Sequence, residues 1–304
     1  MARTRFPADA GLSTRMLATL FLLGLLYVVF VAVLIALRIP TILIVLIAGG
    51  FLLVQYFFSD RIALAAMRGR EVTPQQAPQL HAIVDRLCAL ADMPKPRVAV
   101  AESDVPNAFA TGRSPRRAVV CATTGILRRL DEPELEAVLA HELSHVAHRD
   151  VAVMTIASFL GILAGFVVRG SLYAGLGGGY RRRSDQDNTG QVVLLVVLAS
   201  AVVYALSFLL TRALSRYREL AADRAGAVLT GRPSTLAAAL VKVSGEMGRI
   251  PTRDLRAAEP LNAFFFAPAL ARGFSLSSLF STHPDLQRRL DQLARIEAEM
   301  GRSA

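Results

Sequence analysis

Two long runs of uncharged, mostly apolar residues near the start of this chain constrain its fold more than any other feature. Met16–Leu37 extends for 22 residues without a charge, and Ile39–Phe58 follows directly after Arg38. A helix needs about 20 such residues to cross a bilayer. The first run is too long for the apolar part of a signal peptide, and no small-residue cleavage site follows it. The two runs therefore predict a transmembrane hairpin.

Two further apolar runs, Val151–Val168 and Val192–Leu210, favour four spans in total. Arginines flank the first hairpin on one side, at positions 3, 5, 15, 61, 68 and 70. Basic residues mark the cytoplasmic side of membrane proteins, so the domain after residue 60 is expected there. However, Arg169 and residues 181–183 place arginines in the loop between the later runs. Those runs either span the membrane or form a hairpin that only dips into it.

The sequence between and after these runs has the patterns of shorter helices and strands. Helical spacing of apolar residues covers 80–90, 234–247 and 284–300, while 97–101 and 118–122 are typical of strands. We expect four segments: tail and hairpin (1–60), a first cytoplasmic part (61–150), the second apolar hairpin (151–211) and a second cytoplasmic part (212–304). The predicted fold class is mainly α, with a small β-sheet and about four transmembrane helices.

The chain is strongly basic, with a net charge of +10 that comes almost entirely from arginine. In a chain with long apolar runs, anionic lipid headgroups explain this excess better than nucleic acid does. The lipid bilayer is therefore an expected partner, and nucleic acid is not. The two cysteines, Cys88 and Cys121, are isolated and indicate no disulfide framework.

The most informative motif is His141-Glu142-Leu143-Ser144-His145. Residues four apart lie on one face of a helix, so both imidazoles can bind one zinc ion. Glu142 lies beside them, where a general base would activate water. Asp131 and Pro133 fit the start of the helix that carries the motif. The sequence therefore predicts one catalytic Zn²⁺ per chain, held in part by His141 and His145.

Charged residues on both sides of this motif exclude a site at the centre of the bilayer. Glu134 and Glu136 precede it, and His148 to Asp150 follow it. The site is therefore expected in water, close to the membrane. His148 is best explained as a cation at a helix C-terminus. His81, on the polar side of an early helix, is expected at the surface.

A catalytic zinc needs a third protein ligand, and geometry favours Glu219. His145 comes about 9 Å of helix before the third apolar run, and Glu219 comes about 13 Å after the fourth. An out-and-back pair of helices would bring both to a similar height. Asp223, one turn later, could orient a ligand imidazole. The alternatives are salt bridges, from Glu219 to Arg216 or Arg218, and from Asp223 to Arg224 or another helix.

Together these motifs resemble the M48 membrane metallopeptidases of the heat-shock HtpX type. The resemblance extends over nearly the whole chain and rests on the order of four motifs. They are Asn107–Gly112, the His-Glu-Leu-Ser-His pentad, Glu219–Asp223 and Ser281-Thr282-His283-Pro284. The related CAAX-processing branch shares the metal motif but usually has more spans and a longer chain.

This resemblance implies a zincin fold, in which the active-site helix lies beside a small sheet. The edge strand would bind the substrate backbone by β-addition, and here it would include Asn107, Ala108, Phe109 and Ala110. Asn107 could also contact the scissile peptide, or be only a turn residue before the strand. By the same resemblance, His283 would stabilise the tetrahedral intermediate, or merely start a helix, and Arg289 would support it.

The resemblance also implies a zinc endopeptidase of a bacterial inner membrane, with its catalytic domain in the cytoplasm. Its substrates would be unfolded polypeptides and misfolded or damaged membrane proteins, in stress response and quality control. Three alternatives remain open: a processing peptidase with a narrow substrate, a non-catalytic zinc-binding scaffold, and a transporter. The absence of a cysteine pair and the presence of Glu142 argue against a scaffold. The charge-free runs argue against a transporter.

Overall fold

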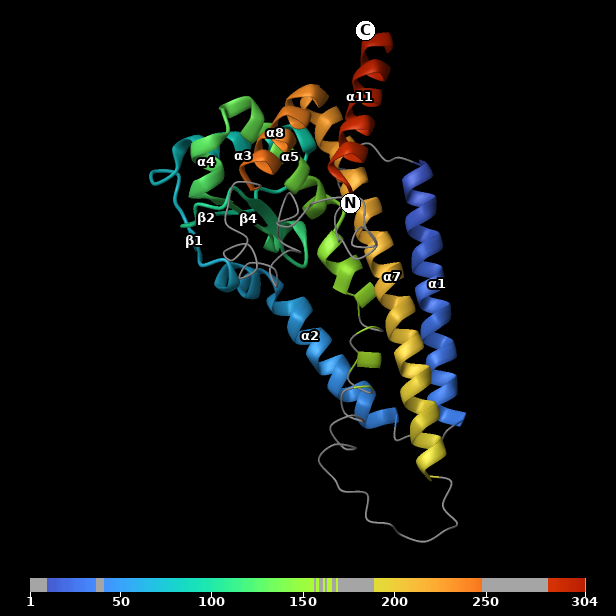
Figure 1. Ribbon diagram of the computed structural model, residues 1–304. Coiled ribbons are helices and arrows are strands. Elements are labelled where there is room, and N and C mark those ends of the chain that lie inside the picture. Colours follow the sequence, from blue (N-terminus) through green and yellow to red (C-terminus); the bar gives the residue numbers. More distant parts are fainter. Residues whose placement is uncertain are drawn as a thin grey trace.

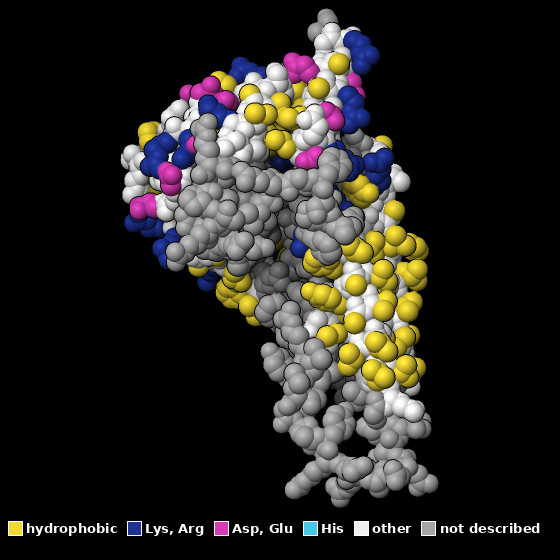
Figure 2. Space-filling view, in the orientation of Figure 1, with side chains coloured by type: hydrophobic (Ala, Val, Ile, Leu, Met, Phe, Trp, Pro, Cys, Tyr) yellow, Lys and Arg dark blue, Asp and Glu magenta, His cyan; other side chains and the backbone are white. Residues whose placement is uncertain are grey.

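A stalk of long helices carries a head of shorter helices and one small sheet (Figure 1). The computed structural model of the chain describes residues 10–36, 41–155, parts of 157–168, 189–247 and 284–303. On the face shown in Figure 2, apolar side chains cover the described part of the stalk, whereas charged side chains gather on the head. This division is the one expected when the stalk lies in lipid and the head in water.

Three long helices form the described part of the stalk: α1 (Ala10–Ala36), α2 (Thr41–Ala66) and α7 (Thr189–Thr230). Helices α1 and α7 lie side by side (Figure 1). Within the described residues, Ser13–Val33 and Leu194–Thr230 are long and apolar enough to cross a membrane. The expectation of four spans is therefore not confirmed, and Val151–Val168 is only partly described.

The head contains a four-stranded mixed sheet in the order β1-β2-β4-β3. Its strands are β1 (Gly69–Glu71), β2 (Arg97–Ala101), β3 (Ala108–Thr111) and β4 (Val119–Thr123). Strands β2 and β4 are parallel, and the other two pairs are antiparallel. The sequence predicted β2 and β4 to within one residue but missed β1, which is only three residues long. Strand β3 forms an edge of the sheet.

Helices pack on the sheet and on one another to form the core of the head. They are α3 (Pro78–Ala91), α4 (Thr124–Arg129), α5 (Glu132–Ala147), α8 (Pro233–Met247) and α11 (Leu286–Ser303), with a 3₁₀ turn at Pro115–Arg117. Apolar side chains from α3, α5, α8 and α11 make one continuous core. The prediction that His81 lies at the surface was wrong. It is buried, and its Nε2 lies 2.9 Å from the carbonyl oxygen of Val72.

Helix α5 begins where the sequence predicted, because its first residues satisfy the free backbone N–H groups there. Asp131 accepts a hydrogen bond from the N–H of Glu134, and the Glu134 side chain accepts one from the N–H of Asp131. This capping box, with Pro133 in the first turn, fixes the start of the helix. It therefore also fixes the direction in which the two histidines of the His-Glu-Leu-Ser-His motif project from the helix.

Helix α7 approaches α5 very closely at Gly226. A Cβ atom on this residue would lie 2.8 Å from the backbone nitrogen of His141 and 3.1 Å from its Cα. Only glycine permits this approach, although it weakens the helix itself. The contact brings the aqueous end of α7, with Glu219, against the middle of α5.

Candidate metal centre

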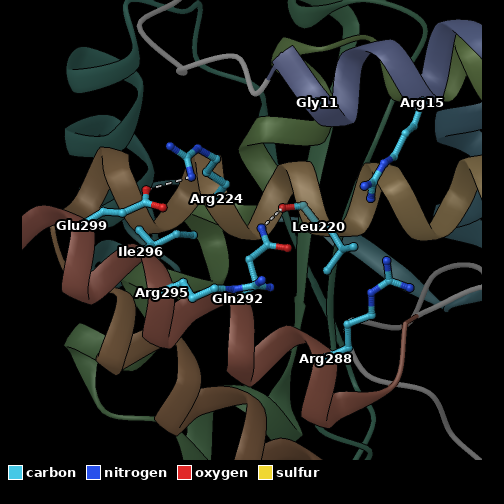
Figure 3. Close-up of a pocket in the computed structure, with 9 residues that line it drawn as sticks. All are labelled: Gly11, Arg15, Leu220, Arg224, Arg288, Gln292, Arg295, Ile296 and Glu299. Atoms are coloured by element: carbon cyan, nitrogen blue, oxygen red, sulfur yellow. Dashed lines mark hydrogen bonds and ion pairs between the residues drawn. The ribbon is translucent and has the colours of Figure 1, made fainter.

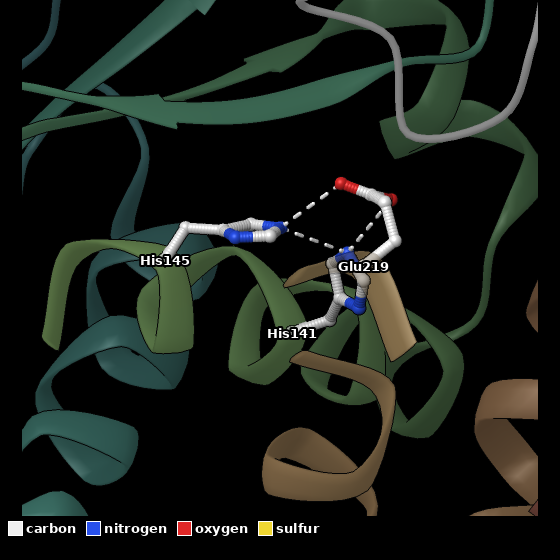
Figure 4. A group of neighbouring side chains, drawn as sticks. All are labelled: His141, His145 and Glu219. Atoms are coloured by element: carbon white, nitrogen blue, oxygen red, sulfur yellow. Dashed lines mark hydrogen bonds and ion pairs between the residues drawn. The ribbon is translucent and has the colours of Figure 1, made fainter. Parts of the chain in front are cut away.

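Two helices bring three potential metal ligands together. His141 and His145 project from α5, and Glu219 projects toward them from α7 (Figure 4). The two Nε2 atoms are 3.3 Å apart, and Glu219 Oε1 lies 3.4 Å from His145 Nε2. Glu219 Oε2 lies 3.8 Å from His141 Nε2. All three ligand atoms fall within 4.8 Å of one another, so this group could hold a metal ion.

The donor set and its spacing fit zinc. Two imidazoles and one carboxylate match the ligands of catalytic zinc sites, which leave a fourth position open. A tetrahedral ion about 2.0–2.1 Å from two imidazole nitrogens holds them roughly 3.3 Å apart. The observed separation of the two Nε2 atoms, 3.3 Å, agrees with this value. All three residues are at least mostly buried, which favours a fixed geometry.

A carboxylate and a guanidinium lie behind His141. Its Nδ1 is 2.9 Å from Oδ1 of Asp223, which is fully buried on α7. Arg289 of α11 donates from Nε and Nη2 to the two Asp223 oxygens, at 2.7 and 2.6 Å. Two roles were predicted as alternatives for Asp223: orienting a ligand imidazole, or pairing with another helix. The structure shows both contacts. A carboxylate at Nδ1 directs Nε2 of the ring toward the metal position.

The same arrangement lies behind His145, although no sequence pattern predicted it. Nδ1 of His145 is 2.5 Å from Oδ2 of Asp150, which pairs with Arg218 of α7. Burial opposes the charge on Asp150, but Arg218 and His145 outweigh it and lower the pKa of the carboxyl to about 2. Although burial would lower the pKa of His145, Asp150 and Glu219 raise it to about 9 in the metal-free protein. Among the described residues, Arg218 thus pairs with Asp150, and its alternative pairing with Glu219 is not seen.

Glu142 faces the edge strand of the sheet. Its Oε2 accepts a hydrogen bond of 3.0 Å from the backbone N–H of Ala110. Burial raises the pKa of its carboxyl, whereas the nearby imidazoles of His141 and His145 oppose the rise. A carboxylate with a raised pKa, beside a metal position, is suited to accept a proton from water near neutral pH.

Strand β3 presents part of its backbone to this site. Asn107 accepts a hydrogen bond from the N–H of Thr123 in β4, and the pairing alternates along an antiparallel ladder. The backbone groups of Ala108 and Ala110 therefore point away from β4, as the Glu142 contact shows for Ala110. The side chain of Phe109 is buried in a small cluster under the sheet. Asn107 is fully buried directly before the strand.

Other candidate residues have different surroundings. His148 caps the C-terminal end of α5, with Nδ1 2.8 Å from the carbonyl oxygen of Ser144. This agrees with the expected helix-end role. His283 lies outside the described residues, so its predicted role stays a prediction. Arg289, expected to support His283, contacts Asp223 and lies 3.9 Å from Glu219.

A helix carrying His-Glu-x-x-His beside the edge of a small sheet, with a third donor from a second helix, defines a zincin-type metallopeptidase, here attached to apolar helices. Residues 74–297 match the family described as Peptidase family M48. The chain belongs to this family. It is 62% identical to "Protease HtpX homolog 1" of Streptomyces coelicolor, over 98% of this chain and 97% of that protein. It is 54% identical to "Protease HtpX homolog" of Moorella thermoacetica, over 98% of each chain.

A solved structure shares the fold. The crystal structure of S. mikatae Ste24p superposes with a TM-score of 0.53 at 18% sequence identity, over 94% of this chain and 66% of that one. At this identity the likeness supports the architecture alone. The chain is thus a metalloprotease of the HtpX type, with a mostly helical fold and a small sheet.

Proposed function

We propose that this protein is a zinc-dependent endopeptidase at the cytoplasmic face of the membrane, where it hydrolyses misfolded or damaged membrane proteins. The proposal rests on one observation: helices α5 and α7 bring their metal-binding side chains to the same point. His141, His145 and Glu219 converge there, and Glu142 links them to the edge strand. A closed structural site would use four protein ligands, and this group offers three within the described residues.

In this proposal His141, His145 and Glu219 hold the ion, and each imidazole is oriented by a buried carboxylate. When bound, zinc polarises the scissile carbonyl and lowers the pKa of a water ligand to about 7. Asp223 and Asp150 keep both Nε2 atoms directed at the same point. Because both carboxylates are held by arginines, the histidines need little rearrangement when the ion enters.

The remaining chemistry falls to residues of the chain. Glu142 takes a proton from the attacking water and transfers it to the leaving amine. Its contact with Ala110 places this carboxylate next to the strand on which a substrate would lie. The substrate backbone would pair with the outward groups of Ala108 and Ala110, in the manner of an added strand. Asn107 and His283 would steady the oxyanion.

The surroundings of the site support a membrane-protein substrate. The metal ligand Glu219 lies toward the polar end of the long apolar helix α7, so chains emerging from the same bilayer come within reach. Pairing through the backbone selects for extended polypeptide more than for side-chain sequence, which suits unfolded clients. The arginines around the first hairpin favour the cytoplasmic side for the head.

Hydrolysis of casein and of a destabilised membrane protein by the purified full-length protein tests the proposal. We expect activity that a chelator removes and that added zinc restores. Glu142→Gln should abolish hydrolysis while zinc content, measured by atomic spectroscopy, stays at one per chain. Loss of zinc together with activity would show that Glu142 has a structural role. A single product from a single substrate would favour the narrow processing peptidase instead.

A further inference from the structure

An open pocket of about 270 Å³ lies where α1, α7 and α11 meet, at the level where the stalk joins the head. Its polar lining consists mainly of arginine side chains from all three helices. Arg15 and Arg288 point toward each other at one end, and Arg224 points toward Glu299 at the other (Figure 3). The polar lining residues are Arg15 of α1, Arg224 of α7, and Arg288, Gln292 and Arg295 of α11, with Glu299 at one end. The mechanism proposed above uses none of them.

Positive charge in this pocket is not balanced. The pocket is lined by four arginines and one carboxylate, and Glu299 is already 3.2 Å from Nη1 of Arg224. In the part of the chain that the structure describes, Arg15, Arg288 and Arg295 have no carboxylate partner. Like charges held close together repel, and an anion between them would remove that repulsion. Guanidinium groups match the oxygen geometry of phosphate in particular.

The shape of the pocket is held by the protein itself. Gln292 donates from Nε2 to the backbone carbonyl of Leu220 at 2.7 Å, which ties α11 to α7 at the middle of the pocket (Figure 3). Arg224 reaches Glu299 across the same two helices. The arginines therefore project from fixed helices, and a ligand would not have to bring the helices together.

The position of Arg15 indicates that the ligand comes from the membrane. This residue immediately precedes the charge-free run that begins at Met16. Residues three or four apart share one face of a helix, so the pocket side of α1 continues into the apolar run. The residues on this face are Gly11, Arg15, Ala18, Leu22 and Leu25. Leu22 and Leu25 are 48% and 51% exposed, which leaves an apolar track for an acyl chain.

We propose that this pocket binds the phosphodiester headgroup of an anionic phospholipid, whose acyl chains lie along α1. Basic pockets between membrane helices are known to bind such headgroups. The site is separate from the metal centre, and the proposal does not rest on proteolysis. It also has a consequence for the metal centre, because Arg288 is adjacent to Arg289. A headgroup held at Arg288 would stabilise the turn of α11 that carries the contact with Asp223.

Binding of fluorescent phosphatidylglycerol to the full-length protein in neutral detergent micelles tests this proposal. Competitors are unlabelled phosphatidylglycerol, phosphatidylcholine, inorganic phosphate and glycerophosphoglycerol. The test variant is Arg288→Gln with Arg295→Gln, both exposed. The matched control is Arg232→Gln with Arg302→Gln, which removes the same charge from exposed positions outside the pocket. Arg288→Lys with Arg295→Lys keeps the charge, and melting temperatures report whether each variant folds.

We expect phosphatidylglycerol to compete far better than phosphatidylcholine, with an affinity that falls as salt is added. The glutamine test pair should weaken binding on the order of 30-fold, from the usual contribution of two basic residues at a headgroup. The control pair should bind like wild type. The lysine pair should bind more weakly than wild type but more tightly than the glutamine pair, because it keeps the charge and loses the forked geometry of guanidinium. Equal binding by the test and control pairs would overturn the proposal. Equal competition by inorganic phosphate or glycerophosphoglycerol would overturn the assignment to a lipid.

Discussion

Gly226→Ala tests whether the close approach of α7 to α5 builds the metal centre. The new Cβ would lie 2.8 Å from the backbone nitrogen of His141, whereas ordinary contacts begin at 3.4 Å. The helices must therefore separate by ~0.6 Å at this point. The opposing atoms belong to the backbone and cannot rotate away. Overpacking of this kind costs about 1–3 kcal/mol, while replacing a helical glycine by alanine gains up to about 1 kcal/mol.

Gly245→Ala in α8 is the matched control, because nothing lies within 4 Å of its Cβ position. Both variants share the gain in helix propensity, so the difference in their stability, about 1–3 kcal/mol, isolates the steric clash. Ligand distances in zinc sites lie within about 0.2 Å of their ideal values, so Gly226→Ala, which moves α7 away from α5, should also weaken zinc binding. Chelator competition and thermal unfolding measure both effects. If Gly226→Ala stabilises the protein as much as Gly245→Ala and binds zinc normally, the reasoning is refuted.

Three further predictions concern the residues around the ligands. Asp150→Asn should lower zinc affinity on the order of 10–100-fold, as Asp223→Ala should, because each change removes a carboxylate behind a ligand imidazole. Chelator competition at constant pH measures this, and unchanged affinity would contradict it. Zinc affinity should rise with pH and level off near pH 9, because zinc must displace a proton from His145, whose pKa is about 9 without metal. Calorimetry in buffers of different ionisation enthalpy should detect about one released proton at pH 7, and zero would refute the assignment. Arg289→Met should unfold at a lower temperature than wild type, since the buried carboxylate of Asp223 loses both guanidinium contacts and keeps only the His141 imidazole, at a cost of up to about 3–5 kcal/mol. The exposed control Arg302→Met should be neutral.

Some parts of the site could be predicted from the sequence. They are the residues on a single helix and those whose height follows from the lengths of the apolar runs. Helical spacing places His141 and His145 on one face, and the capping box at Asp131 fixes where that face begins. Glu219 could be selected because two apolar runs of similar length return the chain to the same height. Strand β2 and most of β4 followed from their short β-branched runs.

The missed features depend on turns and on tertiary packing. Asp150 reaches His145 because α5 ends at Ala147 and Arg149 adopts a left-handed conformation, with φ of 56°. A non-glycine residue in that conformation carries no reliable sequence signal. The importance of Gly226 appears only when α7 is placed against α5. A motif search that asked for a carboxylate shortly after the second histidine would have found Asp150.

His81 shows the opposite failure, in which a helical pattern was interpreted too simply. Its position on the polar side of α3 suggested exposure, but the chain before α3 folds back over that side. The carbonyl oxygen of Val72 then satisfies one ring nitrogen, so the histidine can be buried at little cost. Strand β1, which precedes Val72, was too short to show an alternating pattern.

We propose that Glu219 completes a catalytic zinc site with His141 and His145. Zinc titration of Glu219→Ala against a competing chelator, with Glu246→Ala as the control, tests it most directly. Glu246 pairs with Arg129, 3.0 Å away, and is not among the three grouped ligands. Removing a direct ligand should weaken zinc binding by more than about 100-fold, beyond the usual loss for an outer carboxylate, and should abolish hydrolysis, while Glu246→Ala behaves like wild type. Normal zinc binding by Glu219→Ala would contradict the account.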